Sequence, residues 1–448
     1  MNRKHVPVVA VTASCGFFLM LSLGPGPEYS RRAAHRFAPR QIALAQDSDN
    51  FVNVRAFGAK GNGIADDTAA IQAAIDAAKP GEVIYFTPGI YTVSNFVVKN
   101  RAGLSFRGEG RESVIRQKSG AGRIATFESS RDIVISNLTF DANGIQAFGG
   151  VTFYAVARVR IENNRFFDSA PKPWGKPDRD SFNFARGSEP SRDIEITDNA
   201  IEDLQLDFAH SQRVVVARNV IRRGGKTAGI GIYSVGDNSI AEDFQIADNR
   251  VIDPIGAGFN VGIDSATDAH CIFRKITLAG NQVIRTKTAG YGIRIGTPDN
   301  SKRTTGNIFE DIAIVNNRLT VESGAPQPLP LIFANSSVHA EIRFERLVVA
   351  GNTIENDGPI NREFAIDLRR IRNSIVADNS VRGVANGIAI GGDLFANEIR
   401  GNVVAASDIA YALADSVGKN QAAHNRFLGN PKQAWKLSDL HSSDSIKR

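Results

Sequence analysis

The feature that most constrains the fold is a motif that recurs eleven times: a short alternating strand, an asparagine, and a second short strand. Its copies run from DIVISNLTF to QAAHNRFLG, and successive asparagines are 20 to 36 residues apart. A fixed motif at variable spacing is typical of a solenoid in which one copy makes one turn. The asparagines are Asn137, Asn164, Asn199, Asn219, Asn249, Asn281, Asn317, Asn352, Asn379, Asn402 and Asn425.

Apolar residues alternate on both sides of each asparagine, as Ile133, Ile135, Leu138 and Phe140 do around Asn137. This period of two indicates strands with one buried face and excludes helices from the motif. The asparagine suits a tight bend between the two strands, because it tolerates left-handed geometry and its amide can bond the equivalent residue one coil away. We therefore interpret these asparagines as a structural ladder.

A third strand-like segment separates successive motifs, so each coil has three strands. These segments are LQLDF (204–208), GIGIYS (229–234), GFNVGID (258–264), YGIRIG (291–296), LIFAN (331–335), FAIDLR (364–369) and NGIAIG (386–391). Three strands per irregular repeat stack as a parallel β-helix whose coils are ~4.8 Å apart. The sequence therefore predicts an all-β, right-handed parallel β-helix over residues 46–425.

Two segments flank the predicted coils. Asp66, Asp67 and Thr68 supply helix-start residues, an apolar stripe follows, and Lys79-Pro80-Gly81 ends it, which predicts a short helix near 67–78. We expect this helix to cap the open end of the solenoid, where unpaired strand edges would invite aggregation. At the other end, residues 426–448 break the repeat and are predicted to form a C-terminal cap and tail.

The first 45 residues have the order of a secretory signal. Arg3 and Lys4 precede an apolar run at 6–23, which ends at Gly24-Pro25. Export to the periplasm or the extracellular space is the expectation, with no membrane contact after cleavage, and an uncleaved anchor is the alternative. Only Cys15 and Cys271 are present, so after cleavage the fold must be stable without disulfides, and no cysteine-based metal site is possible.

The net charge gives little support for a nucleic-acid partner. The chain has 53 basic and 47 acidic residues, but residues 1–45 hold six of the basic residues and only one acidic residue. The remainder therefore carries 47 basic and 46 acidic groups. A near-neutral domain without a basic stripe argues against nucleic-acid binding.

The segment FGAKGNGIADDTAAIQAAIDAA, followed by EVIYFTPGIYTV, resembles the N-terminal signature of the pectate-lyase-like superfamily. That group contains rhamnogalacturonase-like, polygalacturonase-like, mannuronan-epimerase-like and phage-tailspike-like β-helices. With the asparagine repeats, the resemblance covers about residues 51–425 and implies a β-helix that acts on carbohydrate polymers.

The motifs that carry chemistry in particular branches are largely absent. Mannuronan epimerases resemble one another at an Asp-Pro-His segment, whereas Asp253-Pro254 is followed here by Ile255. Of the polygalacturonase motifs, only Arg294-Ile295-Gly296 partly matches, to an Arg-Ile-Lys strand. The resemblance therefore indicates the fold and the substrate class more specifically than the reaction.

Candidate catalytic residues follow from aligning the third strands by their inward positions. Taking Leu206, Ile232, Ile263, Ile293 and Ile366 as inward places Asp207, Tyr233, Asp264, Arg294 and Asp367 outward on one sheet. Asp207 and Asp264 would then lie two coils apart, a separation that suits an inverting glycoside hydrolase. The same stripe also suits a lyase, in which Tyr233 or a neighbouring base removes a proton beside a uronate carboxylate and Arg294 neutralises the developing charge.

Other polar residues are candidate substrate-binding groups. His210 and His270 follow third strands, and the long loop 169–191 could wall the groove and stack on a sugar. The full substrate-binding set is Trp174, Lys176, Asn260, His210, His270, Asp367 and Arg369. For any single outward residue the alternative is a solvated surface.

No cofactor or metal site is predicted, although Asp264, Asp268 and Asp299 could instead gather a calcium ion. The sequence predicts an exported enzyme that cleaves glycosidic bonds of an acidic polysaccharide, with Asp207 and Asp264 as acid and base. The alternatives are a polysaccharide lyase using Tyr233 and Arg294, and a non-catalytic carbohydrate-binding surface protein. A homotrimer is left open.

Overall fold

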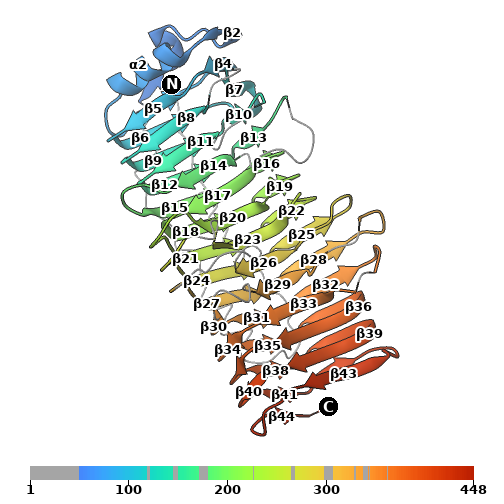
Figure 1. Ribbon diagram of the computed structural model, residues 1–448. Coiled ribbons are helices and arrows are strands. Elements are labelled where there is room, and N and C mark those ends of the chain that lie inside the picture. The colour runs from blue at the N-terminus through green and yellow to red at the C-terminus, as the bar shows by residue number, and fades with distance from the viewer. Residues whose placement is uncertain are drawn as a thin grey trace, which may run out of the picture. The chain divides into compact units, whose positions relative to one another are not determined.

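The computed structural model describes residues 50–118, 122–144, 150–170, 180–225, 227–263, 268–296, 306–326, 329–335, 342, 344–360 and 362–447. Within them nearly all the regular secondary structure is β-strand, and all the strand pairs are parallel. The prediction of an all-β parallel β-helix with three strands per coil is confirmed. Figure 1 shows strands of successive coils lying side by side.

The first strand of each coil belongs to a 19-stranded sheet, called sheet A here. Its strands are β1 (Phe51–Asn53), β3 (Val83–Tyr85), β6 (Ala102–Arg107), β9 (Arg131–Ser136), β12 (Ala157–Glu162), β15 (Ser191–Thr197), β18 (Ser211–Ala217), β21 (Ile240–Ala247), β24 (Ile272–Ala279), β27 (Ile308–Val315), β30 (Phe344–Glu345), β31 (Val348–Ala350), β34 (Ile371–Arg372), β35 (Ile375–Ala377), β37 (Leu394–Phe395), β38 (Glu398–Arg400), β40 (Ser416–Gly418), β41 (Gln421–Ala423) and β44 (Ser445–Ile446).

The second and third strands form a 25-stranded sheet. The second strands are β2 (Asn62–Asp66), β4 (Gly89–Val93), β7 (Ser113–Gln117), β10 (Thr139–Asp141), β13 (Arg165–Phe167), β16 (Ala200–Glu202), β19 (Val220–Arg222), β22 (Arg250–Ile252), β25 (Gln282–Arg285), β28 (Arg318–Val321), β32 (Thr353–Asn356) and β42 (Arg426–Phe427). The third strands are β5 (Phe96–Lys99), β8 (Ala125–Glu128), β11 (Val151–Tyr154), β14 (Asp180–Ala185), β17 (Gln205–Ala209), β20 (Ala228–Ser234), β23 (Ala257–Ile263), β26 (Ile293–Gly296), β29 (Ile332–Asn335), β33 (Phe364–Arg369) and β43 (Gln433–Ser438), while β36 (Ser380–Gly391) and β39 (Val403–Ala414) span both positions.

The interior is filled by rows of apolar side chains, one row per strand position. In the third strands, Phe127, Phe153, Phe184 and Phe208 stack on one another, with ring centroids 4.5–5.2 Å apart. All four are at most 1% exposed. Because each ring lies on the ring of the next coil, the backbone of the third strands is held in a fixed register, and outward residues on those strands keep fixed positions.

The asparagine ladder forms as a chain of buried side-chain bonds. Asn219 is typical: its Nδ2 donates to Asn249 Oδ1 at 3.0 Å, and its Oδ1 accepts from the backbone N and Nδ2 of Asn199, both at 2.9 Å. Among the described residues the ladder runs from Asn164 to Asn425, and Asn137 is not part of it. Leu138 occupies the ladder position in that coil, and its backbone N donates to Asn164 Oδ1.

The left-handed residue of each bend is the one before the ladder asparagine, which corrects the sequence-based expectation. Positive φ angles of 55–67° occur at Asn163, Asp198, Arg218, Asp248, Gly280, Asn316, Gly351, Asp378 and Gly401, but not at the ladder asparagines. The asparagine is thus selected for its amide bonds between coils, and the preceding residue absorbs the tight bend.

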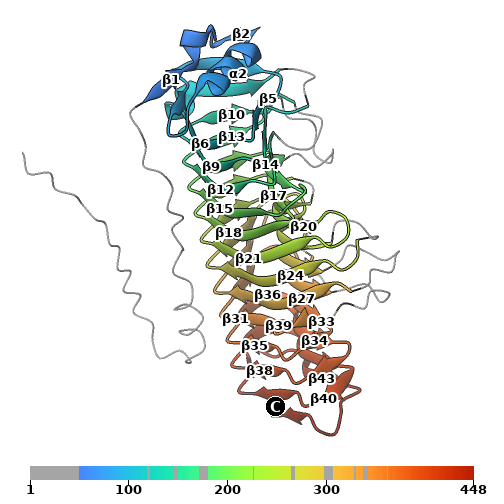
Figure 2. The same ribbon diagram turned by 90° about the vertical axis from the view of Figure 1, so that its left-hand side faces the viewer.

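The two flanking segments contain regular structure. Helices η1 (Val54–Phe57), α2 (Thr68–Ala77) and η2 (Gly110–Glu112) are the described helical elements, and α2 lies beside β5 (Figure 2). Gln72 of α2 bonds both backbone groups of Val97 in β5. The role of α2 as a cap of the solenoid stays a prediction.

At the other end, β43 and β44 pair in parallel with β39 and β41, so strands continue past residue 425, the boundary expected from the sequence.

A row of alternating charges crosses sheet A at left-handed positions. In consecutive coils it reads Asp132, Arg158, Asp193, Arg213, Asp243, Lys275, Asp311 and Arg346, with φ angles of 53–60°. Arg213 Nε lies 2.6 Å from Asp193 Oδ1, and Arg158 and Arg346 pair likewise with Asp132 and Asp311. Each charge faces an opposite charge in the neighbouring coils, so the row favours one register of the strands.

This charge row predicts a specific loss of stability at neutral pH in Arg213→Met. In the wild type, the hydrogen bond from Arg213 to Asp193 lowers the pKa of the Asp193 carboxyl below its usual range. A lowered folded-state pKa stabilises the fold above the unfolded pKa of about 3.9, and this contribution is lost as pH falls through the folded-state pKa. Because the pair is partly exposed, we expect a cost of about 0.5–1 kcal/mol at pH 7 that shrinks below about pH 4.

Urea unfolding of Arg213→Met and of the wild type at pH 7 and at pH 3 measures this difference. Arg250→Met, which removes an exposed arginine with no ion pair among the described residues, is the matched control. A cost that is equal at both pH values would show that the Arg213 side chain stabilises by packing rather than by charge.

Candidate active site

The outward residues of the third strands form a row that crosses seven successive coils. Strand pairing places Asn183, Asp207, Gly231, Asn260, Arg294, Phe333 and Asp367 next to one another in that order. We call this set the outer row. Successive members are ~4.8 Å apart, so the outer row offers a linear polymer a track along the solenoid.

The register of the outer row differs from the alignment expected from the sequence. Leu206 pairs with Ile230 rather than Ile232, so Gly231, and not Tyr233, stands beside Asp207. Tyr233 pairs instead with Ala209 and Gly262. The alternating pattern fixes which face of a strand is buried, but a shift of two residues leaves that face unchanged, so the pattern could not fix the register.

The shifted register nevertheless brings Asp207 and Tyr233 together. A Cβ placed on Gly231 would lie 2.0 Å from Tyr233 Cε2, 2.5 Å from Tyr233 Cζ and 2.6 Å from Asp207 Oδ1. The phenol ring and the carboxylate therefore converge on the space that a side chain at Gly231 would fill. Tyr233 is 8% exposed, and Asp207 is half-buried. A glycine at 231 is what permits this convergence.

Asp207 is held from behind by a polar network. Gln205 Nε2 donates to Asp207 Oδ2 at 2.7 Å and to Asp180 Oδ1 at 3.0 Å. Asn183 Nδ2 donates to the other oxygen of Asp180, which is fully buried. One amide thus joins two carboxylates of adjacent coils, and this arrangement fixes the orientation of the Asp207 carboxylate.

Asn260 and Arg294 continue the outer row beyond Gly231. Asn260 is 5% exposed, and its Nδ2 lies 3.8 Å from the position of a Cβ on Gly262, the residue that pairs with Tyr233. Its amide therefore lies near Gly262, which pairs with Tyr233 on one side and with Gly296 on the other. Arg294 is half-buried and lies one coil further on, with its guanidinium carbon 5.6 Å from the centre of the Tyr291 ring.

The other predicted substrate-binding residues lie at the end of the outer row or at turns. Arg369 Nε is 2.6 Å from Asp367 Oδ1 on the same strand, so these two charges neutralise each other. His210 and His270 both have left-handed backbone geometry at the bends that follow third strands. The Nδ1 of His210 accepts from the backbone N of Ile240 at 3.1 Å, and burial lowers the pKa of His210. His210 therefore holds the start of β21.

Three of the predicted residues, Asp264, Trp174 and Lys176, lie outside the described residues, as does Asp299 of the calcium alternative. Asp268 is described and accepts from Ser234 Oγ at 2.7 Å. Within the described ranges, no group of three or more His, Cys, Asp and Glu residues is placed to hold a metal ion. The same residues contain no helix that is long and apolar enough to cross a membrane.

Sequence reasoning missed Asp180, Gln205 and Gly231. The sequence-based prediction of a long loop at 169–191 is wrong for residues 180–185, which form strand β14 and place Asp180 beside Gln205. Gly231 had a signal, since GIGIYS has a glycine at an outward position of a strand, which marks a close approach of another group.

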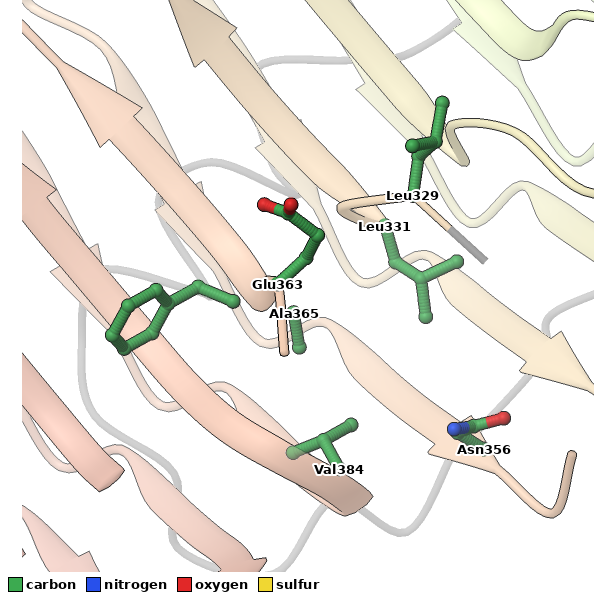
Figure 3. A pocket seen from close by; sticks show the side chains of 7 residues that line it. Leu329, Leu331, Asn356, Glu363, Ala365 and Val384 are labelled. Atoms are coloured by element: carbon green, nitrogen blue, oxygen red, sulfur yellow. The ribbon is translucent and has the colours of Figure 1, made fainter. Parts of the chain in front are cut away.

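A small pocket lies apart from Asp207 and Tyr233, at the start of β29 and β33. Figure 3 shows Leu329, Leu331, Ala365 and Val384 around it together with Asn356 and Glu363. None of the predicted catalytic residues lines this pocket.

Comparisons with known proteins agree with the geometry of the fold. A family model described as "Rhamnogalacturonase A/epimerase, pectate lyase-like" matches residues 51–228. Alginate lyase 7 of Azotobacter vinelandii is 40% identical over 128 residues, which are 25% of this chain and 15% of that protein. Mannuronan C5-epimerase AlgE2 of the same organism is 29% identical over 237 residues, 49% of this chain and 23% of that protein. The chain thus spans less than a quarter of the length of these relatives.

Two solved structures share the fold at low sequence identity. A family 28 exopolygalacturonase of Yersinia enterocolitica has a TM-score of 0.54 at 13% identity, covering 91% of this chain and 80% of that one. The surface protein and adhesin PfbA of Streptococcus pneumoniae also has a TM-score of 0.54, at 15% identity, covering 86% and 99%. The predicted resemblance is confirmed: residues 51–228 match a pectate-lyase-like family model, and the chain is a right-handed parallel β-helix with the same fold as these solved structures.

Proposed function

We propose that this chain is a polysaccharide-active enzyme, and that it acts as a lyase on a uronate polymer. The observation that supports this most directly is the convergence of Asp207 and Tyr233 over Gly231. A carboxylate and a phenol are a base and an acid of different strength, and both lie over Gly231 in the outer row. Eliminating a glycosidic bond needs such a pair on the same sugar.

In the proposed reaction, Asp207 removes the proton on the carbon that bears the uronate carboxylate. That C–H bond breaks, a C=C bond forms to the neighbouring carbon, and the bond from that carbon to the glycosidic oxygen breaks. The Tyr233 hydroxyl donates its proton to the leaving oxygen, and once the product departs the proton that Asp207 took passes to the Tyr233 phenolate, which restores both groups. No oxidant or cofactor is needed for this balance.

Charge that develops on the substrate carboxylate is stabilised by donors next to the pair. Asn260 lies beside Gly231 in the outer row, and its amide lies near Gly262, the residue that pairs with Tyr233. Arg294 is one coil further on and supplies a positive charge. Donors already held in place stabilise developing charge without reorganisation, which is the largest contribution in many enzymes.

The hydrolase hypothesis has weaker support among the described residues. Its second carboxylate, Asp264, lies outside them. Asp180 shares the Gln205 amide with Asp207, but it is fully buried and already bonded by Gln205 and Asn183. Asp180 therefore has no exposed oxygen with which to activate a water beside a sugar.

A C5-epimerase is the second candidate, because it shares the first step and differs in returning a proton to the opposite face. The match to a mannuronan C5-epimerase over 49% of this chain favours it, as the match to an alginate lyase favours elimination. Binding without catalysis is the third, and the adhesin PfbA shows that the fold alone does not decide between them.

The test is to incubate the purified full chain with alginate, polygalacturonate and neutral polysaccharides while following reducing ends and ultraviolet absorbance together. A lyase produces both signals from a uronate polymer. New reducing ends without absorbance would overturn the proposal in favour of a hydrolase. Solvent deuterium entering the polymer without either signal would establish the epimerase, and silence in all three measurements would leave binding.

Gly231→Ala is expected to remove activity without unfolding the chain. The added methyl would meet the Tyr233 ring at 2.0 Å and must displace it. Displacement of a reacting group by about 1 Å can cost about 100-fold in rate, so we expect at least that loss, measured on the most active polymer. Gly122→Ala, where an added Cβ meets nothing within 4 Å, is the matched control. Full activity in Gly231→Ala would show that the Tyr233 position is not needed.

A further inference from the structure

Arg285, the last residue of β25, is a fully buried cation that the proposed reaction does not use. Its guanidinium donates to the backbone oxygens of Pro254 (3.0 Å), Gly256 (2.7 Å), Ala289 (2.5 Å) and Tyr291, and to Thr288 Oγ1 (3.0 Å). Arg285 thus ties the loop before β26 to the corresponding loop of the preceding coil.

Burying a guanidinium is costly, which makes its partners informative. Burial lowers the pKa of Arg285 to about 10, so the side chain stays charged at neutral pH. It uses that charge on backbone carbonyls, and no carboxylate of the described residues accepts a hydrogen bond from it. A planar guanidinium with donors on several sides can hold such a set of carbonyls in one arrangement, whereas an ammonium cannot. The consequence is a fixed loop from 286 to 291.

The loop ends at Tyr291, whose ring lies against two members of the outer row. The Tyr291 and Phe333 ring centroids are 5.0 Å apart at an interplanar angle of 34°, and the Arg294 guanidinium carbon is 5.6 Å from the Tyr291 centroid. All three side chains are half-buried. We call Tyr291, Arg294 and Phe333 the aromatic platform. It begins one coil beyond Asn260, on the same outward face as Asp207.

The charge on the platform is not neutralised from within the described chain. Arg294 has no described carboxylate within salt-bridge distance, unlike Arg369, which pairs with Asp367 at the end of the outer row. A cation beside two aromatic rings suits a ligand with an apolar ring face and a negative charge. A uronate ring has both, because its C–H groups stack on an aromatic face and its carboxylate can pair with a guanidinium.

We propose that the aromatic platform is a binding subsite for a second uronate ring of the polymer, and that Arg285 is the positioning residue that builds it. This inference rests on the proposed function for the identity of the polymer. Arg294 lies two coils from Gly231 and Phe333 lies three coils from it, so the platform holds the polymer at a distance from the reacting bond. The two rings of the platform therefore act on substrate binding and on the length of substrate preferred, rather than on the chemical step, in which only Arg294 of the platform takes part.

Two measurements test this proposal. Calorimetry measures the binding of saturated oligomers of the uronate polymers in a Tyr233→Phe background, in which turnover is suppressed. Steady-state kinetics measure KM and kcat in the chain that keeps Tyr233. Tyr291→Ala and Phe333→Ala are each expected to weaken binding and to raise KM by about tenfold with kcat little changed. Arg285→Lys keeps the charge and is expected to give a smaller rise in KM than Arg285→Met. Tyr85→Ala, on sheet A, is the control.

Each outcome bears on one proposal at a time. If the active chain cleaves a uronate polymer but both platform variants bind and turn over as the wild type does, the subsite is wrong and the proposed function stands. If no polymer is turned over while uronate oligomers bind in a Tyr291-dependent manner, the proposed function fails and the subsite stands. Equal binding of neutral oligomers would overturn the role of Arg294. If Arg285→Met unfolds, Tyr291→Ala and Arg285→Lys still decide.

Discussion

Tyr233→Phe is expected to lose at least about 100-fold in kcat on the uronate polymer that the wild type cleaves best, because positioned acid–base groups contribute about 10²–10⁴-fold. The substitution removes only the phenol hydroxyl that donates to the leaving oxygen. The ring that fills the space over Gly231 remains, so the position of Asp207 and the fold are retained. KM should change little, since the hydroxyl acts mainly in the transition state.

Asp207→Asn tests the other half of the pair. The amide keeps the shape of the carboxylate but cannot take a proton, so we expect a comparable fall in kcat. If Asp207 and Tyr233 act as one unit, the double variant should be little worse than either single variant. Steady-state rates from ultraviolet absorbance, with circular dichroism to confirm the fold, give these values.

Tyr154→Phe is the matched control. Tyr154 occupies the same strand position as Tyr233 in an earlier coil: it pairs with Ala185, and Tyr233 pairs with Ala209. It loses a hydroxyl from the same face at a distance from Asp207, and near-normal activity is expected. Near-normal activity in Tyr233→Phe instead would contradict the proposed acid.

The fold was predictable because its determinants are local and repeat. Ile133 and Ile135 on one side of the bend, and Leu138 and Phe140 on the other, carry the period of two that indicates a strand with one buried face. The ladder asparagines mark the bend in each coil, and all of them from Asn164 onward form the expected bonds. What failed was the assignment of left-handed geometry, which depends on φ at the preceding residue rather than on a side-chain pattern.

The site was less predictable because it depends on contacts between coils. Asp207, Tyr233 and Arg294 were named from their outward positions, but only strand pairing shows that Gly231 and Asn260 stand between Asp207 and Arg294. Inward Ile230 and Ile232 are both buried and equally acceptable as partners of Leu206, so hydrophobicity cannot choose between them. The register is decided by features that bind coil to coil, such as the stacked phenylalanines and the charge row.

Asn219→Ala is expected to lower the free energy of unfolding by at least about 3 kcal/mol, since a buried group left without a partner costs about 1–3 kcal/mol. Asn219 is fully buried, and its amide donates to Ile196 O and Asn249 Oδ1 and accepts from Asn199. Alanine removes all of these bonds and leaves at least two polar groups unsatisfied. Urea unfolding followed by circular dichroism measures the loss.

Two comparisons separate the hydrogen bonds from the lost volume. Asn425→Ala removes the last member of the same ladder, which is half-buried and bonded on one side only by another ladder asparagine, so a smaller cost is expected.

Asn219→Asp keeps the volume but points a buried carboxylate at Ile196 O. Burial raises the folded-state pKa of such a group, so the stability of this variant should increase as pH falls through that pKa toward the unfolded value, because only the protonated form can donate. If Asn219→Asp were as stable as the wild type at pH 7, or if Asn425→Ala cost as much as Asn219→Ala, the ladder would owe its stability to packing rather than to these bonds.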